Sequence, residues 1–126
     1  MSSENNDIID SMIIIEKEVA LTVIKEMAGK MFGNMVKAVV DIEKEIIALD
    51  AGLHADEEAL LIENGSNNSS LWGINLYPEF YGTDDFVEFD SMINIRPVQG
   101  NKTRTVEDSG IREKIVGIVN NLVKNE

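Results

Sequence analysis

The chain's only histidine, His54, is the one side chain whose ordinary pKa lies near neutral pH. It stands two residues before a run of acids that begins at Asp56, at the predicted start of a helix. A histidine oriented by a carboxylate can transfer protons as a general acid or base. A histidine at a helix start can instead hydrogen-bond locally and do no chemistry. The sequence shows no recognisable orienting partner, so we favour the second interpretation and keep the first as an alternative.

Polar side chains alternate along two predicted strands, 71–77 and 86–96. Residues two apart on a strand share a face, so a hairpin of these strands would have one apolar and one polar face. The residues of the polar face are Asn75, Tyr77, Glu88, Asp90, Asn94 and Arg96. Such amides, carboxylates and a guanidinium can hold a polar ligand. The alternative is a solvated sheet face with cross-strand pairs.

All three arginines follow residue 95 in the sequence. Arg96 and Arg104 are the candidates for holding a small anion, although each arginine can equally pair with an acid of the chain itself. Trp72 opens an aromatic-rich stretch, 72–89, which suits either a binding surface or the centre of the core. We expect Trp72 to lie in the core because it falls on the apolar strand face.

The composition excludes several classes of chemistry. The 126 residues include no cysteine and one histidine, which excludes disulfides, thiolate catalysis, Fe–S clusters and HExxH zinc sites. The phosphate-binding patterns GxGxxG and GxxxxGK are also absent. We therefore expect no metal and no cofactor.

The charge and hydropathy patterns constrain the partners. The net charge of −12 disfavours binding to nucleic acid and to anionic membranes. No apolar run approaches the ~20 residues that span a bilayer. We expect a cytoplasmic protein whose partner is another protein or a small anionic ligand. Self-association into a homo-oligomer is compatible with the sequence.

The elements that position these side chains follow from periodicity and turn signals. The sequence predicts strands over 12–15, 35–42, 45–50, 71–77 and 86–96, and helices over 19–31, 54–64 and from an Asp108 N-cap to 123. Residues 1–11 are expected to be a flexible acidic tail, and 12–126 a single α+β domain. The predicted fold is a single mostly antiparallel sheet with helices packed on one face, in the order β-α-β-β-α-β-β-α.

Four stretches carry a family resemblance: 31–41, 53–61, 71–79 and 88–101. Together they resemble a family of small, uncharacterised bacterial and archaeal proteins, a domain of unknown function. The resemblance implies a prokaryotic protein with one domain over about residues 12–123, and it brings no activity with it. The positions within or beside these motifs are His54, Glu57, Trp72, Asn75, Asp90, Asn94, Arg96 and Arg104.

The sequence leaves three hypotheses for function. We favour a small acidic interaction or ligand-binding domain without catalytic activity. The alternative is a small hydrolase or transferase for an anionic substrate, with His54 as the acid/base, Asp90 or Glu57 orienting it, and Arg96 and Arg104 holding the anion. A purely structural subunit of an assembly is the third. The sequence does not decide whether the protein is an enzyme.

Overall fold

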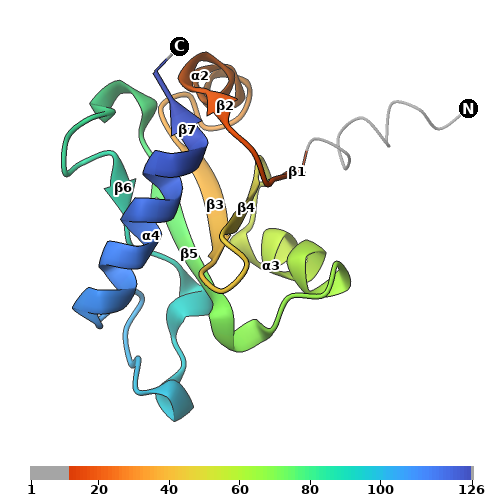
Figure 1. Ribbon diagram of the computed structural model, residues 1–126, viewed down its shortest axis with the longest axis vertical. Coiled ribbons are helices and arrows are strands. Elements are labelled where there is room, and N and C mark those ends of the chain that lie inside the picture. The colour runs from red at the N-terminus through yellow and green to blue at the C-terminus, as the bar shows by residue number, and fades with distance from the viewer. Residues whose placement is uncertain (1–11, 126) are drawn as a thin grey trace, which may run out of the picture.

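The structure, a computed structural model, describes residues 12–125. The predicted acidic tail, residues 1–11, lies outside this part of the chain, and the division into tail and domain stays a prediction. The central sheet has five strands in the order β1-β4-β3-β5-β6, and every neighbouring pair is antiparallel (Figure 1). Its strands are β1 (Ile13–Ile15), β3 (Val36–Asp41), β4 (Ile46–Leu49), β5 (Leu71–Leu76) and β6 (Val87–Glu88).

The helices and the remaining strands complete an α+β fold, as predicted. The helices are α2 (Leu21–Lys30), α3 (His54–Glu63) and α4 (Ser109–Leu122), and β2 (Val19–Ala20) pairs in parallel with β7 (Val123–Lys124). Short 3₁₀ helices cover Asn68–Ser70, Pro78–Phe80, Met92–Asn94 and Pro97–Gln99. The predicted Asp108 cap is present, because its side chain accepts a hydrogen bond from the Ile111 N–H at 3.0 Å.

The sheet is covered on both faces. On β3, Ala38 and Val40 belong to the large core with α2 and α4, whereas Val39 packs against Leu61 of α3 in a smaller cluster. Figure 1 shows α4 and α3 on opposite sides of the β3–β5 pair. The expectation that the helices share one face is therefore wrong for α3. The physical reason is that β5 is buried along its whole length. Its side chains point alternately to the two faces of the sheet, so both faces must be covered.

Residues 86–96 do not form the long strand that their alternation predicts. Only β6 pairs with β5, Met92–Asn94 turn into a 3₁₀ helix, and Arg96 forms an isolated bridge with Asn101. The side chain of Asn94 hydrogen-bonds to the main chain of Gly73, where a longer strand would have paired with β5. The polar row expected along one sheet face is consequently split into two groups.

None of the helices within residues 12–125 combines the length and the apolar character needed to cross a bilayer.

Candidate functional site

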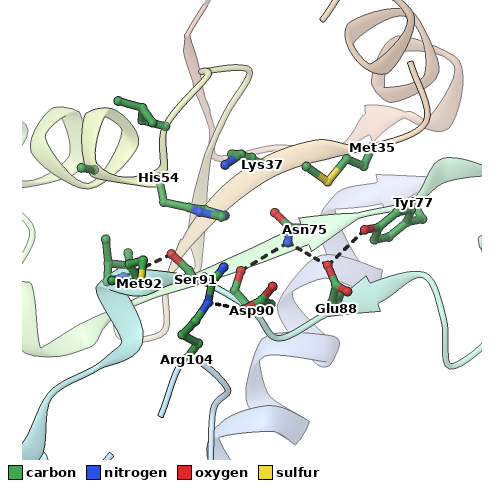
Figure 2. Close-up of a pocket in the computed structure, with 13 residues that line it drawn as sticks. Met35, Lys37, His54, Asn75, Tyr77, Glu88, Asp90, Ser91, Met92 and Arg104 are labelled. Carbon is green, nitrogen blue, oxygen red and sulfur yellow. Dashed lines mark hydrogen bonds and ion pairs between the residues drawn. The ribbon is translucent and has the colours of Figure 1, made fainter. Parts of the chain in front are cut away.

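A cavity of about 400 Å³ lies between the first turn of α3, the α3-facing side of β5 and the segment that follows β6 (Figure 2). Its volume falls in the range of small-molecule sites, about 300 to 1,000 Å³. We call it the α3 cavity. It is lined by Met35, Lys37, Leu53, His54, Ala55, Asn75, Tyr77, Glu88, Asp90, Ser91, Met92, Ile93 and Arg104.

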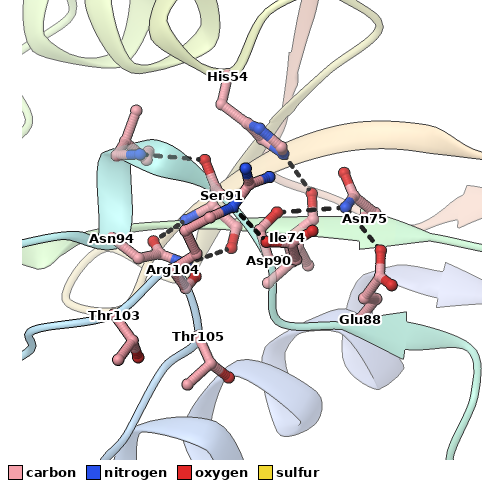
Figure 3. Close-up of polar contacts among 12 residues, drawn as sticks. His54, Ile74, Asn75, Glu88, Asp90, Ser91, Asn94, Thr103, Arg104 and Thr105 are labelled. Carbon is pink, nitrogen blue, oxygen red and sulfur yellow. Dashed lines mark hydrogen bonds and ion pairs between the residues drawn. The ribbon is translucent and has the colours of Figure 1, made fainter.

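His54 opens α3 and is held against the sheet. Its Nε2 lies 2.8 Å from the main-chain oxygen of Ile74, so Nε2 carries the proton and donates to that carbonyl (Figure 3). Burial lowers the pKa of His54 below its ordinary value of 6.5, and the nearby Lys37 lowers it further, against the opposing effects of the Ile74 carbonyl, Asn75 and Asp90. The imidazole is therefore neutral at pH 7.

Glu57, one turn further along α3, supports the start of that helix from inside the protein. It is fully buried, and its Oε2 accepts a hydrogen bond from the Ala51 N–H at 3.0 Å. Burial raises the pKa of Glu57 to about 10, so the side chain is a neutral carboxylic acid at pH 7. It does not line the cavity. The sequence suggests a binding residue or an orienting carboxylate at this position, whereas the Glu57 side chain lies outside the cavity lining and bonds to the Ala51 N–H.

One wall of the cavity is a chain of hydrogen bonds that converge on Glu88. Its Oε1 accepts from Asn75 Nδ2 at 2.8 Å and from the Tyr77 hydroxyl at 3.1 Å. Asn75 Nδ2 also donates to the main-chain oxygen of Asp90 at 3.2 Å. These contacts fix the amide so that its Oδ1 points to the side of Lys37 and His54 (Figure 2). Within residues 12–125 this buried oxygen accepts no hydrogen bond.

Two positive charges also line the cavity, those of Lys37 and Arg104. Arg104 Nε lies 2.7 Å from Asp90 Oδ1, and both side chains are about half exposed. Lys37 is the cross-strand neighbour of Asn75, and its ammonium lies 5.4 Å from the centre of the Phe32 ring. Arg104 and Arg96 make the ion pairs found within residues 12–125, and Lys37 makes none.

Besides Glu57, three of the predicted site residues lie outside the cavity lining. Asn94 is fully buried behind the cavity, where it holds Gly73. Arg96 is paired with Glu58 of α3 at 3.4 Å, donates to the Leu71 carbonyl and stacks on Trp72 at 4.9 Å. Trp72 is only 2% exposed and belongs to the large core, where we expected it.

The structure thus brings together His54, Asn75, Tyr77, Asp90 and Arg104 of the predicted residues. Sequence reasoning missed Lys37 and Ser91. Their signals were present but indirect: Lys37 faces the cavity only because β3 pairs with β5 in this register. Ser91 lies against Gly73, where a Cβ would come within 2.5 Å of the serine Cβ.

The alternative catalytic arrangement needed a carboxylate within hydrogen-bond reach of His54. In the structure His54 bonds to a main-chain carbonyl, and the Asp90 carboxylate is occupied by Arg104. Arg96 does not line the cavity and is unable to share an anion with Arg104 there. The cavity is therefore arranged for hydrogen bonding and charge pairing, with a neutral imidazole at one side.

No curated protein and no solved structure matches the chain. A family model described as "Protein of unknown function" matches residues 13–122, which include every residue that lines the α3 cavity. This match covers most of the chain, and the protein belongs to that family, DUF5674.

Proposed function

We propose that the protein is a ligand-binding domain that holds one small polar molecule in the α3 cavity and does not transform it. The observation that carries the proposal is that polar side chains from several elements converge on this cavity. Side chains from α3, β3, β5, the segment after β6 and the loop before α4 meet at one cavity of about 400 Å³. Polar groups that converge from separate elements on one cavity are the usual mark of a binding site.

The cavity offers both polar and apolar surface. Hydrogen-bonding groups stand on the side of Asn75 and Glu88, whereas Met35, Leu53 and Met92 provide an apolar side. Two of the apolar residues are well exposed, Leu53 at 58% and Met92 at 64%. Exposed apolar side chains beside a polar cavity are typical of a site that gains cover when a ligand enters.

Binding without catalysis is favoured by the ion pairs of Asp90 and Arg96. A general base needs a free nitrogen near the substrate and a group that orients the ring. The Ile74 carbonyl orients the ring, but the proposed acid/base arrangement also needs Asp90 beside the ring and Arg96 on the substrate, and these two are engaged in ion pairs with Arg104 and Glu58. The hydrolase or transferase alternative thus has less support. A cytoplasmic location in a prokaryotic cell belongs to the same proposal and suits a metabolite ligand.

The proposal is tested by recovering the ligand. The protein would be expressed, purified quickly and denatured, and the released small molecules identified by mass spectrometry. A compound enriched with the wild type and depleted with Arg104→Gln supports the proposal. The matched control is Arg112→Gln: Arg112 is also a surface arginine with hydrogen bonds to a carbonyl and a hydroxyl, but it does not line the cavity.

The recovered compound is then added back. At about 100 times its Kd a ligand that binds only the folded state stabilises the protein by about 2.7 kcal/mol, which thermal unfolding detects. Depletion with both arginine variants, or no enriched compound and no stabilisation by a metabolite library, would overturn the proposal. Conversion of the compound by the wild type but not by His54→Gln would establish the catalytic alternative instead.

A further inference from the structure

The first turn of α3 presents an unoccupied end to the α3 cavity. Leu53 stands at the N-cap position and its side chain accepts no hydrogen bond, so the first N–H groups of the helix have no side-chain cap. Leu53, His54 and Ala55 all line the cavity. A helix N-terminus carries about half a positive charge and attracts anions. Of the two acids in the first turn, Glu57 is protonated at pH 7, whereas Asp56 is exposed and offsets part of the charge of the helix end.

Two cations flank the same end of the cavity. Lys37 has no carboxylate partner within residues 12–125. Arg104 uses Nε for Asp90, and a guanidinium has further N–H groups with which it can bind a second carboxylate. An anionic group placed between Lys37 and Arg104, in front of the helix end, would meet both charges and the helix dipole.

A second, independent observation points to a donor on the ligand. Asn75 is 5% exposed, and its Oδ1, on the side of Lys37 and His54, is buried with no hydrogen bond from any of residues 12–125. The amide cannot turn over to relieve this, because its Nδ2 is held by Glu88 and by the Asp90 carbonyl. Leaving a buried acceptor unpaired costs about 1 to 3 kcal/mol, so a ligand N–H beside it would restore that loss.

The charges of the lining also balance. Lys37 and Arg104 stand against Glu88 and Asp90, in a chain whose net charge is −12. Arg104 and Asp90 pair with each other, which leaves Lys37 and Glu88 as the lining charges without an ion-pair partner within residues 12–125. One such group of each sign suits a ligand that is neutral overall and dipolar. The apolar side formed by Met35, Leu53 and Met92 favours a ligand that also carries an apolar substituent.

Resting on the proposed ligand-binding function, we infer that the α3 cavity binds a zwitterion of the α-amino acid type with an apolar side chain. Its carboxylate lies at the α3 N-terminus between Lys37 and Arg104. Its ammonium donates to Asn75 Oδ1, with the Glu88 carboxylate on the other side of the same amide, and its side chain lies against Met35 and Leu53. The ligand therefore needs both charged groups at once.

The test uses isothermal titration calorimetry with L-leucine, L-methionine and L-valine. Two matched probes each lack one charge of leucine: 4-methylpentanoate has no ammonium group, and 3-methylbutylamine has no carboxylate. At least one of the three amino acids is expected to bind, and both matched probes are expected to bind at least about tenfold more weakly than leucine, because each loses a charge-assisted hydrogen bond.

Two exposed positions separate the two ends of the ligand. Arg104→Gln is expected to weaken the binding of leucine and of 4-methylpentanoate while leaving 3-methylbutylamine unchanged. Glu88→Gln is expected to do the reverse, and its amide oxygen still accepts from Asn75. Both side chains are at the surface, so neither variant threatens the fold. Equal effects of both variants on both probes would overturn the assignment of the two ends.

The remaining outcomes distinguish this inference from the proposed function. Binding of 4-methylpentanoate as tight as that of leucine would overturn the zwitterion and leave a carboxylate site. A recovered ligand of another class, with no binding of the three amino acids, would overturn the zwitterion and keep the ligand-binding function. No binding of any probe and no recovered ligand would overturn both.

Discussion

The carboxamide of Asn94 hydrogen-bonds to both main-chain groups of Gly73. Its Oδ1 accepts from the Gly73 N–H at 2.8 Å, and its Nδ2 donates to the Gly73 carbonyl at 2.9 Å. The side chain thereby replaces the strand that β5 lacks beyond β6. Nδ2 also donates to the carbonyl of Arg104 at 2.9 Å (Figure 3). The buried Asn94 amide thus fixes the loop that carries Arg104 to strand β5.

Replacing Asn94 with aspartate is expected to destabilise the protein by about 2 to 4 kcal/mol, because two carbonyls lose their donor and then face a carboxylate in the interior. Urea unfolding at pH 7 measures the change. The control is Asn120→Asp at an exposed position of α4, expected to change stability by no more than about 0.5 kcal/mol. Equal losses for the two variants would show that the Gly73 contact contributes nothing of its own.

Adding a methyl group at Gly73 is expected to displace the segment that follows β6. An alanine Cβ there would lie 2.5 Å from the Ser91 Cβ, which is closer than packing allows. We expect Gly73→Ala to cost about 1 to 3 kcal/mol in unfolding free energy. Gly117→Ala on α4, where nothing lies within 4 Å, should instead stabilise by about 0.5 to 1 kcal/mol.

The same clash offers a rescue. Adding Ser91→Gly to Gly73→Ala removes the serine Cβ and should recover part of the lost stability, although the serine hydroxyl bond to the Ile93 N–H is lost as well. A double variant no more stable than Gly73→Ala would argue against this contact as the cause.

The stability of the protein should fall with rising pH because of Glu57. Its pKa is about 10 in the folded state, raised from 4.5 mainly by burial. Between these values the folded state holds a proton that the unfolded state has released. The contribution of Glu57 to the free energy of unfolding is therefore complete below pH 4.5 and is lost as the pH rises toward 10. Glu57→Gln cannot ionise and its amide oxygen still accepts from the Ala51 N–H.

We expect the free energy of unfolding of Glu57→Gln, relative to that of the wild type, to increase by on the order of 1 kcal/mol for each unit of pH between 7 and 9. Urea unfolding at several pH values measures this, with Glu63→Gln on the exposed part of the same helix as the control. Measurements stay above pH 7 because the lowered pKa of His54 acts in the opposite sense, costing stability as the pH falls below 6.5. Parallel curves for the wild type and Glu57→Gln would contradict the prediction.

His54 reports directly on its surroundings, because it is the only histidine and gives a single set of imidazole signals in NMR. Its pKa should lie below 6.5, with the proton on Nε2 in the neutral form. Lys37→Gln should raise the pKa of His54 by removing a nearby positive charge, and Asp90→Asn should lower it further. Lys25→Gln on α2 serves as the control. A pKa at or above 6.5 in the wild type would show that the imidazole is not desolvated.

Much of the fold could be predicted because local signals were strong. The apolar spacing that begins at Ala20 predicted α2, the turn after β3 predicted its hairpin with β4, and Asp108 marked the start of α4. The failure at 86–96 has a physical cause. Alternation in sequence describes a strand only where main-chain partners exist, and here the partner of β5 is a side chain, that of Asn94.

The candidate site was predictable only in part for a related reason. The alternation of polar and apolar residues pointed to Asn75 and Asp90, and His54 was a candidate because it is the only histidine. Lys37 became a cavity residue through long-range pairing with Asn75, which no local pattern reveals. Arg96 is the opposite case. As an arginine it was a candidate for binding an anion, but its guanidinium is already bound to Glu58 and to the Leu71 carbonyl.

The parallel pair of β2 and β7 joins Val19 to Val123, more than a hundred positions later in the sequence. During synthesis β2 and α2 leave the ribosome long before their partner exists. β2 therefore finds its partner only after residue 124 has left the ribosome, and until then the edge of β2 stays open. A chain in which Val123 and Lys124 are deleted would lack the contact that fastens β2 beside α4.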